Sequence, residues 1–400
     1  MKIDEQRLKI LLVNDYGAPT GGAELQLLHL RDALRQRGHD ARLFTTNAGD
    51  VHSIAADYTC YGTTSRFRTL LQTANPFARR ALKRVLREFQ PDVVHVTIFL
   101  TQLSPLILPL LRKVPSLYYA VWYRMICPLG TKMLPDGTRC LVPAGYVCYS
   151  NDCLPLRDWI FLQMQSRMVK RWRKAFRAVA ANSETVRTSL LSSGFEDVEV
   201  IWPGVAEREP RDSAKLAAIP VVAFAGRLVK EKGADLLLRA FAKTRTQLPD
   251  AQLWILGDGP ERAKLKSASI ALEVEASVIF TGHLDHAEME RRLEQAWVQV
   301  VPSRWPEPFG VVATEAMMRG TAVIASDTGG LSEIVNHGVS GYLVPAGNEE
   351  PLAHLLLKML TDRRLCEIMG KEGHRIALEK FGESASVDRF VSRYRRMLEK

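Results

Sequence analysis

The sequence of 400 residues lacks the long apolar run that a membrane-spanning helix requires. A span needs about 18 consecutive apolar residues, and the best candidate, residues 100–123, is interrupted by three prolines and by Arg112 and Lys113. An export signal is lacking as well, because the chain starts with polar residues and its first apolar run, Leu8–Val13, is short and followed by Asn14. We therefore expect a cytoplasmic protein.

Paired metal ligands are also lacking. No Asp-x-Asp occurs in the chain, so the usual carboxylate clamp for a metal ion on a nucleotide-sugar is missing. The six cysteines include no Cys-x2-Cys pair, which is the common spacing of zinc sites. Four of them crowd into one stretch, namely Cys127, Cys140, Cys148 and Cys153. Without an export signal, disulfides are not expected. We predict no metal and free thiols in a loop, with a structural metal cluster of these cysteines as the alternative.

Acidic residues are scarce in two segments that carry the excess of positive charge. The net charge is +10; residues 66–87 contain seven Arg or Lys and no acid, and residues 157–177 contain seven and a single Asp. This local excess argues against a nucleic-acid binder and indicates one basic face.

The basic residues of 157–177 are interleaved with apolar ones, as in helices that lie on anionic membranes. The apolar residues are Trp159, Ile160, Leu162, Met164, Met168, Val169, Trp172 and Phe176. We predict reversible docking of this helix on an anionic surface, the inner face of the cell membrane. The alternative is a helix that buries its apolar side in the protein's own core.

Apolar strands alternate with amphipathic helices along the chain, which is typical of parallel sheets covered by helices. The length exceeds what one core usually organises, so we expect an α/β protein of two doubly wound, Rossmann-like domains facing a central cleft. The predicted strands are 9–13, 41–45, 93–97, 178–181 and 198–201, then 221–225, 251–256, 277–281, 297–301, 322–325 and 341–344.

The predicted domain boundaries follow from changes in composition. They give an N-terminal domain at 1–205, with an irregular Cys-rich insertion at 124–156, and a polar linker at 206–219. The second domain is expected at 220–375, and the C-terminal helix at 376–400 is expected to pack back on the N-terminal domain.

The segment 302–315 is the most informative for function. It connects a buried strand to a helix that starts at Gly310, so it opens at the carboxyl end of a parallel sheet, where α/β domains bind ligands. The prolines on either side of Glu307 restrict its backbone, which suits a carboxylate that must keep a fixed position. The first amides of the helix are donors for an oxyanion or a sugar hydroxyl; they belong to Phe309, Gly310 and Val311.

Glu315 lies further into the same helix, roughly 7–8 Å beyond Gly310 at a rise of ~1.5 Å per residue. The two glutamates are therefore better placed to hold hydroxyls at opposite ends of an elongated ligand than to act as a close acid and base. Ser303, in the loop itself, is predicted to bind the same ligand.

A second group of candidates follows the first strand of the second domain. Arg227 and Lys232 lie in one loop, where two cations can neutralise a diphosphate and stabilise it as it leaves. Because the metal clamp is missing, such cations would have to carry the leaving-group charge. Gly257 and Gly259, after the next strand, are candidates for the floor of a nucleoside pocket, with a tight turn as an equal alternative.

Glycines also mark the first loop of the chain, Thr20-Gly21-Gly22-Ala23-Glu24. The missing Cβ atoms of Gly21 and Gly22 allow a phosphate to approach the backbone, and Glu24 is expected on the acceptor side. The loop lacks the Gly-x-Gly-x-x-Gly pattern of a dinucleotide site.

As a set, these motifs resemble those of the family 4 retaining glycosyltransferases. The similarity lies in Gly-Gly-Ala-Glu at 21–24, Ala-Gly-Arg-Leu at 225–228, Glu-Lys-Gly at 231–233, Leu-Gly-Asp-Gly-Pro at 256–260, Glu-x7-Glu at 307–315, Thr-Gly-Gly-Leu-Ser-Glu at 328–333 and Gly-Tyr-Leu-Val-Pro at 341–345. In the second domain the similarity extends from about Val221 to Gly347, and in the first domain it is patchier.

The resemblance implies a GT-B fold and a metal-independent, retaining hexosyltransferase with no cofactor, whose donor is a nucleotide diphosphate sugar of the UDP or GDP type. It implies that Arg227 and Lys232 bind the diphosphate and that Glu307 and the amides after it hold the donor sugar. Glu315 would hold the ribose, and Gly22 would approach the phosphates. The acceptor would be lipid-linked or another saccharide, in polysaccharide, lipopolysaccharide or glycolipid assembly.

The sequence departs from the family pattern at one place. The family has an apolar strand, here starting at Ser116, and then a His that contacts the donor sugar; the corresponding residue is Val121. Either another residue contacts the sugar, or the sugar lacks that hydroxyl, or activity is weakened or lost. Two alternatives therefore stay open: a catalytically silent subunit that binds nucleotide-sugars, and a nucleotide-sugar epimerase of the same fold, against which the Glu307–Glu315 spacing argues.

Overall fold

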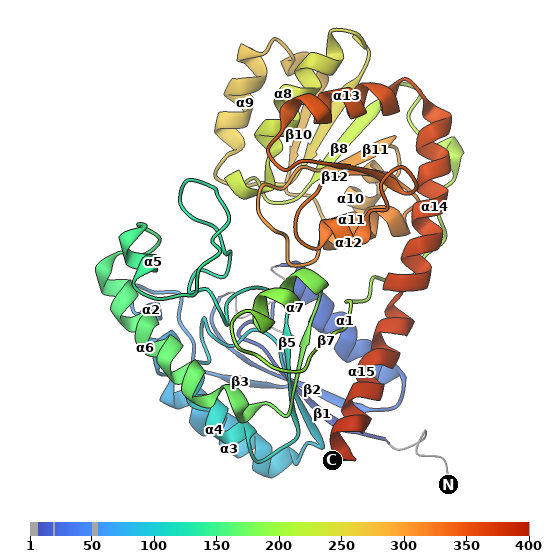
Figure 1. Ribbon diagram of the computed structural model, residues 1–400. Coiled ribbons are helices and arrows are strands. Elements are labelled where there is room, and N and C mark those ends of the chain that lie inside the picture. Colours follow the sequence, from blue (N-terminus) through green and yellow to red (C-terminus); the bar gives the residue numbers. More distant parts are fainter. Residues whose placement is uncertain (1–6, 19–20, 50–54, 400) are drawn as a thin grey trace. The chain divides into compact units, whose positions relative to one another are not determined.

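The computed structural model describes residues 7–18, 21–49 and 55–399 of the chain. They form two compact units, the first made of the residues up to Gly204 together with those from Glu383 onward, the second of Val205–Gly382. Each unit is built on one parallel sheet with helices on its faces (Figure 1). The predicted fold class of two doubly wound parallel sheets is confirmed.

The first unit has a seven-stranded sheet in the order β3-β2-β1-β4-β5-β6-β7. Its strands are β1 (Lys9–Val13), β2 (Asp40–Thr46), β3 (Tyr58–Cys60), β4 (Val93–Val96), β5 (Ser116–Ala120), β6 (Ala178–Ala181) and β7 (Val198–Val200). Parallel strands covered on both faces are apolar throughout, and every residue of β4, β5 and β6 is buried. The edge strand β3 was not predicted.

Helices cover both faces of this sheet. They are α1 (Gly22–Gln36), α2 (Arg68–Thr73), α3 (Pro76–Phe89), α4 (Leu108–Leu111), α5 (Val147–Ser150), α6 (Leu156–Trp172), α7 (Glu184–Leu191) and α15 (Glu383–Leu398). Side chains of β1 alternate between two cores, because successive residues of a strand point to opposite faces. Leu11 and Val13 belong to the core with α3 and α7, and Ile10 and Leu12 to the core with α1 and α15.

The helix α15 completes the second of these cores (Figure 1). His95 of β4 is fully buried, and its Nδ1 lies 2.5 Å from the hydroxyl of Tyr394. The rings of Tyr119 and Phe390 pack against the same imidazole. Burial lowers the pKa of His95 to about 3, so the ring stays neutral in this aromatic cluster. The chain thus returns to the first unit at Glu383. The preceding helix α14 (Arg363–Phe381) belongs entirely to the second unit, so the domain boundary lies after it and not at the predicted 375/376.

The helix α6 corrects the prediction for segment 157–177. Leu162, Val169 and Phe176 were expected to face a membrane, but they are buried in the first unit. Ile160 and Met164 are exposed. The periodicity of the sequence could not tell the side of the helix that packs on the sheet from the side that faces solvent. In the described part of the chain, no helix combines the length and the apolarity that a membrane crossing needs.

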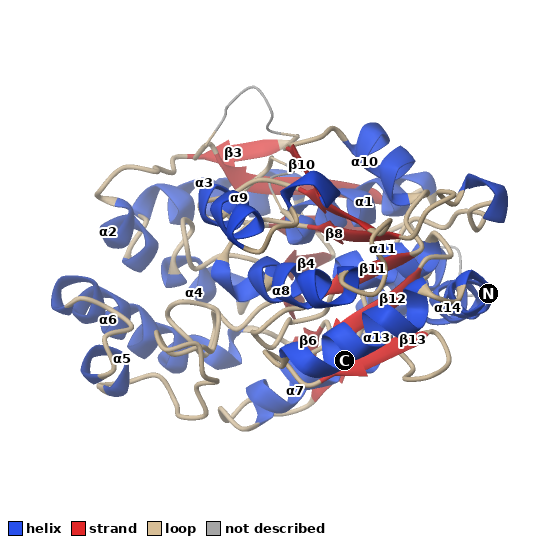
Figure 2. Cartoon of the chain, turned by 90° about the horizontal axis from the view of Figure 1, so that it is seen from above, coloured by secondary structure: helices blue, strands red, loops and turns tan. Residues whose placement is uncertain are grey.

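The second unit has a six-stranded sheet in the order β10-β9-β8-β11-β12-β13. Its strands are β8 (Val221–Ala225), β9 (Gln252–Leu256), β10 (Val278–Gly282), β11 (Val298–Val301), β12 (Ala322–Ser326) and β13 (Gly341–Val344). Its other helices are α8 (Ala234–Arg245), α9 (Arg262–Ala271), α10 (His286–Leu293), α11 (Val311–Met318), α12 (Leu331–Ile334) and α13 (Glu349–Leu360). Figure 2 shows α8 and α13 side by side over this sheet.

The segment 206–219, expected as a linker, is attached to the second unit. The guanidinium of Arg211 donates to the backbone oxygens of Glu294 and Gly320 at 3.1 and 3.2 Å, and its own amide donates to the oxygen of Arg319 at 2.8 Å. Arg208 and Lys215 pair with Glu294 at 2.9 Å each, so polar side chains of the segment attach it to the second unit.

The insertion 124–156 is irregular, as predicted, apart from the short α5 and a bridge between Met133 and Arg139. Its four cysteines are free and partly exposed. Across residues 7–18, 21–49 and 55–399, no three His, Cys, Asp or Glu side chains are arranged so that they could hold a metal ion. The geometry therefore does not favour the alternative of a structural metal cluster.

Candidate active site

The loops after β8 and β11 meet in the second unit, where the strand order reverses. Ligands bind at such a switch point in doubly wound sheets, beyond the carboxyl ends of the strands. Gly233 ends the β8 loop with a φ of +71°, and a Cβ there would lie 2.0 Å from the carbonyl oxygen of Pro302 in the β11 loop. Only glycine therefore lets these two loops touch.

The contact between the loops brings Lys232, Glu307 and Ser303 together. Lys232 Nζ lies 2.6 Å from Glu307 Oε1, and the Ser303 hydroxyl donates to the same oxygen at 2.6 Å. The Glu307 side chain is 8% exposed and that of Lys232 is 23% exposed, so the carboxylate is held in one orientation in a largely dry place. In the described chain no side chain or amide donates to Oε2 of Glu307, because Lys232 and Ser303 both bind Oε1. That oxygen is available to a ligand.

The backbone around Glu307 is also fixed. Gly330 donates its amide to the oxygen of Glu307 at 2.7 Å, and a Cβ on Gly330 would lie 2.4 Å from the oxygen of Phe309. The Thr328–Glu333 motif is thus the support of the Glu307 loop. Just beyond, three amides at the first residue of α11 and the two residues before it find no acceptor in the described residues. They belong to Phe309, Gly310 and Val311, as predicted from the sequence.

Glu315, in the second turn of α11, has a carboxyl group to which no described residue donates a hydrogen bond. Burial raises the pKa of Glu315 to about 7; the positive charge of Arg319 lowers this pKa, and the negative charge of Glu290 raises it. Arg319 is itself buried and pairs with Glu290 at 2.6 Å, so little of its charge is left for Glu315. The carboxyl of Glu315 is desolvated without a protein partner, a state that ligand hydroxyls would relieve.

Arg227 is exposed at the end of β8. Within the described ranges no carboxylate pairs with it. Arg304, on the other loop, is engaged differently: it binds both oxygens of Asp235, at 2.5 and 2.7 Å. Of these two arginines, Arg227 is the one that a phosphate could reach without breaking an ion pair.

Gly257 and Gly259 have a structural role. A Cβ on Gly257 would lie 2.0 Å from the oxygen of Gly226, and one on Gly259 would lie 2.4 Å from the oxygen of Leu228. Both glycines therefore hold the loop that carries Arg227 close to the end of β9. The alternative of a tight turn accounts for them, and their contact with a nucleoside stays a prediction.

The predicted residues of the first loop lie in the other unit. Gly21 is the N-cap of α1 and Gly22 is its first residue; Thr20 lies outside the described residues. Glu24 folds back over the helix start, with Oε2 2.7 Å from the place of a Cβ on Gly21. A phosphate that approached the backbone of Gly21 would therefore be repelled by the carboxylate of Glu24.

The sequence patterns did not identify Asp15 as a residue that positions a loop at this edge of the first sheet. It is fully buried, and its carboxylate accepts hydrogen bonds from the amide and hydroxyl of Thr101, at 2.7 and 2.6 Å, and from the amides of Gln102 and Leu103, at 3.0 and 2.8 Å. Burial raises the pKa of Asp15 and these donors lower it. Its place directly after β1 was the signal that could have identified it. Asp15 fixes the loop that follows β4.

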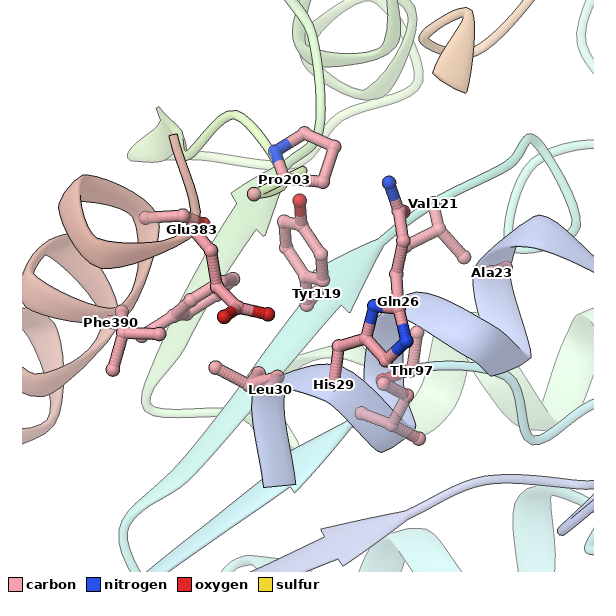
Figure 3. A pocket seen from close by; sticks show the side chains of 14 residues that line it. Ala23, Gln26, His29, Leu30, Thr97, Tyr119, Val121, Pro203, Glu383 and Phe390 are labelled. Carbon is pink, nitrogen blue, oxygen red and sulfur yellow. The ribbon is translucent and has the colours of Figure 1, made fainter. Parts of the chain in front are cut away.

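A pocket lies at the same edge of the first sheet, between α1, the ends of β4 and β5, and α15 (Figure 3). Val121, where the family pattern has a His, forms part of its wall beside Thr97 and Tyr119. Val121 can offer a ligand only apolar contact, so no group at this position can replace the imidazole.

Comparisons with known proteins agree with this architecture. The model for glycosyl transferases group 1 matches residues 206–375, and the model for Glycosyltransferase Family 4 matches residues 20–124. The chain belongs to the group 1, family 4 glycosyltransferases. The resemblance stated from the sequence motifs is thereby confirmed, and the two family matches lie on different units.

The curated relatives differ in the share of this chain that they match. An uncharacterized glycosyltransferase of Methanocaldococcus jannaschii is 35% identical over 40% of the chain and 41% of its own length. The chain spans about half the length of several such curated relatives. A GDP-mannose-dependent monoacylated alpha-(1-6)-phosphatidylinositol monomannoside mannosyltransferase of Corynebacterium glutamicum is 26% identical over 92% of both chains. The structure of Anabaena HepE in complex with UDP and glucose covers 97% of this chain and 99% of its own, with a TM-score of 0.69 and 22% identity, and so supports the fold.

Proposed function

We propose that this protein is a retaining, metal-independent glycosyltransferase that uses a nucleotide diphosphate sugar of the UDP or GDP type. The observation that carries the proposal is the fixed Glu307 carboxylate, held by Lys232 and Ser303 with one oxygen free, beside three unoccupied helix-start amides. A carboxylate and helix amides suit sugar hydroxyls and an oxyanion respectively. The family matches and the mannosyltransferase relative from Corynebacterium glutamicum support a sugar transfer.

In the proposed reaction, the bond between the anomeric carbon of the donor sugar and the phosphate oxygen breaks. The bond between that carbon and an acceptor oxygen forms on the same face, and the acceptor proton passes to the leaving phosphate. Glu307 Oε2 holds the donor sugar. Glu315 accepts hydrogen bonds from the ribose hydroxyls.

The charge of the leaving diphosphate is carried by Arg227 and Lys232. Arg227 is unpaired in the described chain, and Lys232 has three donor positions, so it can keep Glu307 while another N–H faces a phosphate. Because no Asp-x-Asp clamp exists in the sequence, these fixed cations take the place of a metal ion.

The test is donor binding followed by donor hydrolysis, each with EDTA and with magnesium. UDP, GDP and ADP are screened by thermal shift, since a ligand that binds only the folded state raises Tm. We expect one base to be selected, and the matching nucleotide-sugar to be slowly hydrolysed in EDTA. Nucleotide binding without hydrolysis or transfer would favour a silent subunit. A change of configuration at one carbon of the donor sugar, without release of the nucleotide, would favour an epimerase.

A surface of the first unit supports a membrane-bound, lipid-linked acceptor. The helix α2 lies beside α6, where Thr73 donates its hydroxyl to the oxygen of Phe161 at 3.3 Å (Figure 1). Five apolar side chains, each about half exposed, gather on the two segments and define the α2–α6 patch. They are Phe67, Leu70, Leu156, Ile160 and Met164.

Exposed cations accompany this patch. They are Arg66, Arg68, Arg157, Arg167, Lys170 and Arg171. Apolar side chains flanked by Lys and Arg suit the boundary between headgroups and acyl chains of an anionic bilayer, where each cation contributes about 1 kcal/mol. Docking through the α2–α6 patch is reversible, because even a single acyl chain holds a protein on a bilayer only reversibly.

A further inference from the structure

Arg319 directly follows α11, the helix that carries Glu315, and its side chain is only 1% exposed. Its amide donates to the backbone oxygen of Glu315 at 3.0 Å, so the two residues lie one turn apart on the same side of the helix. Side chains at this spacing have Cβ atoms about 5–6 Å apart, and a Glu four positions before a basic residue is the favourable order for an ion pair. The local sequence therefore favours a bond between Glu315 and Arg319.

The structure contains a different ion pair. Within residues 7–18, 21–49 and 55–399 no ion pair joins Arg319 to Glu315. The guanidinium binds both carboxylate oxygens of Glu290 on α10, with Nη2 2.6 Å from Oε1 and Nε 3.0 Å from Oε2. Its remaining nitrogen, Nη1, donates to Oε1 of Gln299 at 3.1 Å. Two parallel N–H bonds from a guanidinium to one carboxylate are stronger than a single contact, so Arg319 is held by α10 and not by its own helix.

Glu290 is itself held in place by a second arginine. Arg208, in the segment 206–219, donates to Oε2 of Glu290 and, at 2.9 Å, to Oε1 of Glu294. Burial raises the pKa of Glu290, but the hydrogen bonds and charges of Arg319 and Arg208 lower it, and the resulting pKa lies below the ordinary value. Glu290 is therefore ionised at neutral pH and keeps its hold on Arg319.

The partner that Arg319 takes decides what the Glu315 carboxyl can bind. Two charged side chains act on this carboxyl, since Arg319 on the same helix lowers its pKa and Glu290 on α10 raises it. If Arg319 bound Glu315 in the way that it binds Glu290, a buried cation would occupy the carboxylate oxygens. Ribose hydroxyls would then have to displace a charge-assisted hydrogen bond. The contact with Glu290 removes this competition.

We propose that Glu290 is a positioning residue for the nucleotide. By holding Arg319 at α10, it keeps the carboxyl of Glu315 free for the ribose hydroxyls. This role rests on the proposed function, which places the ribose at Glu315. Glu290 lies outside all of the sequence motifs, and through Arg208 it connects the nucleotide site to the segment by which the chain enters the second unit.

The test measures the affinity of the whole protein for UDP and for GDP by isothermal titration calorimetry, at several pH values from 6 to 8. Glu290→Gln keeps the size of the side chain and removes its charge, so that Glu315 becomes a carboxylate partner for Arg319. Glu294→Gln is the matched control. Glu294 also binds Arg208 at 2.9 Å, but in the described chain it makes no ion pair with Arg319.

We expect Glu290→Gln to weaken binding of the preferred nucleotide roughly tenfold at pH 8. The rise in affinity from pH 6 to pH 8 should disappear as well, because a carboxyl group paired with Arg319 is ionised throughout this range. Glu294→Gln should change Kd less than about twofold.

A double variant distinguishes positioning from a merely structural role. With Glu290→Gln and Arg319→Gln together, no cation is left to bind Glu315, so the affinity should return to within about threefold of the wild type. If Glu290 only stabilised the fold, the second substitution would restore nothing. Wild-type affinity of Glu290→Gln at both ends of the pH range, or a double variant that binds no better than the single one, would overturn the inference.

Arg319→Met provides the same decision if Glu290→Gln does not fold. Without the positive charge, Glu290 still raises the pKa of Glu315, so the rise in affinity should move to higher pH. An unchanged pH profile in Arg319→Met would show that Arg319 does not act on Glu315, and the role of Glu290 would be wrong.

The wild-type measurements separate this inference from the proposed function. If the wild type binds UDP or GDP and hydrolyses the donor while Glu290→Gln behaves like the wild type, the role of Glu290 is wrong and the transferase stands. If the wild type binds neither nucleotide, the proposed function fails, and the role of Glu290 fails with it.

Discussion

The carboxyl group of Glu315 makes the stability of the second unit depend on pH. Its pKa is about 7 in the folded protein and 4.5 for the unconstrained side chain. Between these values the folded state holds the proton and the unfolded state releases it, so the free energy of unfolding falls as the pH rises. At 1.36 kcal/mol per pKa unit, the difference amounts to about 3 kcal/mol.

The substitution Glu315→Gln removes this dependence, because glutamine cannot ionise. Relative to the wild type, the variant should gain about 2.5 kcal/mol of stability between pH 5 and pH 8, because part of the titration lies outside this range. Urea unfolding followed by tryptophan fluorescence measures this, and the matched control is Glu275→Gln at an exposed position of the same unit. A stability difference for Glu315→Gln that is the same at both pH values would refute the account of a desolvated carboxyl.

Ligand binding should show the opposite dependence. Ribose hydroxyls donate hydrogen bonds and favour the ionised carboxylate, so the affinity for the nucleoside diphosphate should rise from pH 6 to pH 8. Glu315→Gln should bind more weakly and with no such rise. Parallel pH profiles of the variant and the wild type would remove Glu315 from the ribose site.

Three further outcomes are expected. Arg227→Ala should lower donor turnover by about 100-fold and leave the free energy of unfolding unchanged, and EDTA should not lower the rate of the wild type. An unaltered rate in the variant, or a wild-type rate that depends on magnesium, contradicts the leaving-group role of Arg227. Glu307→Gln should weaken binding of the nucleotide-sugar at least about tenfold and binding of the free nucleoside diphosphate less than about twofold. Equal losses would contradict the placement of Glu307 at the sugar end of the donor and Glu315 at its ribose end. Replacing Ile160 and Met164 together by Ser should reduce flotation with anionic vesicles, while Ile270→Ser, at another exposed isoleucine, should not; equal binding to neutral and anionic vesicles would end the membrane proposal.

The strands could be predicted where both of their faces are buried, because such segments are apolar throughout. β8 and β13 were predicted at their observed bounds, 221–225 and 341–344. β3 was missed because it has three residues at the sheet edge and only Cys60 is buried. A short edge strand leaves no periodic signal in the sequence.

The candidate residues could be identified one at a time, but their contacts could not. The ion pair of Lys232 with Glu307 joins residues 75 positions apart, and it exists because β8 and β11 are neighbours in the sheet. The pocket of the first unit was missed for the same reason, since Gln26, Thr97 and Glu383 come from three distant segments and match no motif. Sequence spacing does not specify which loops a sheet brings together.

The return of α15 to the first unit determines the order in which the two cores can close during synthesis. Val205 donates its amide to the oxygen of Phe381 at 2.8 Å, and a Cβ on Gly204 would lie 2.7 Å from the Cα of Glu383. The whole second unit is thus inserted between the body of the first unit and its last helix. A nascent chain has every strand of the first sheet when residue 200 is complete, yet the aromatic partners of His95 on α15 are made only after the inserted unit. Since domains fold as they emerge, the second unit can finish first, while the part of the earlier sheet's face beside α1 that α15 covers stays exposed until α15 is made.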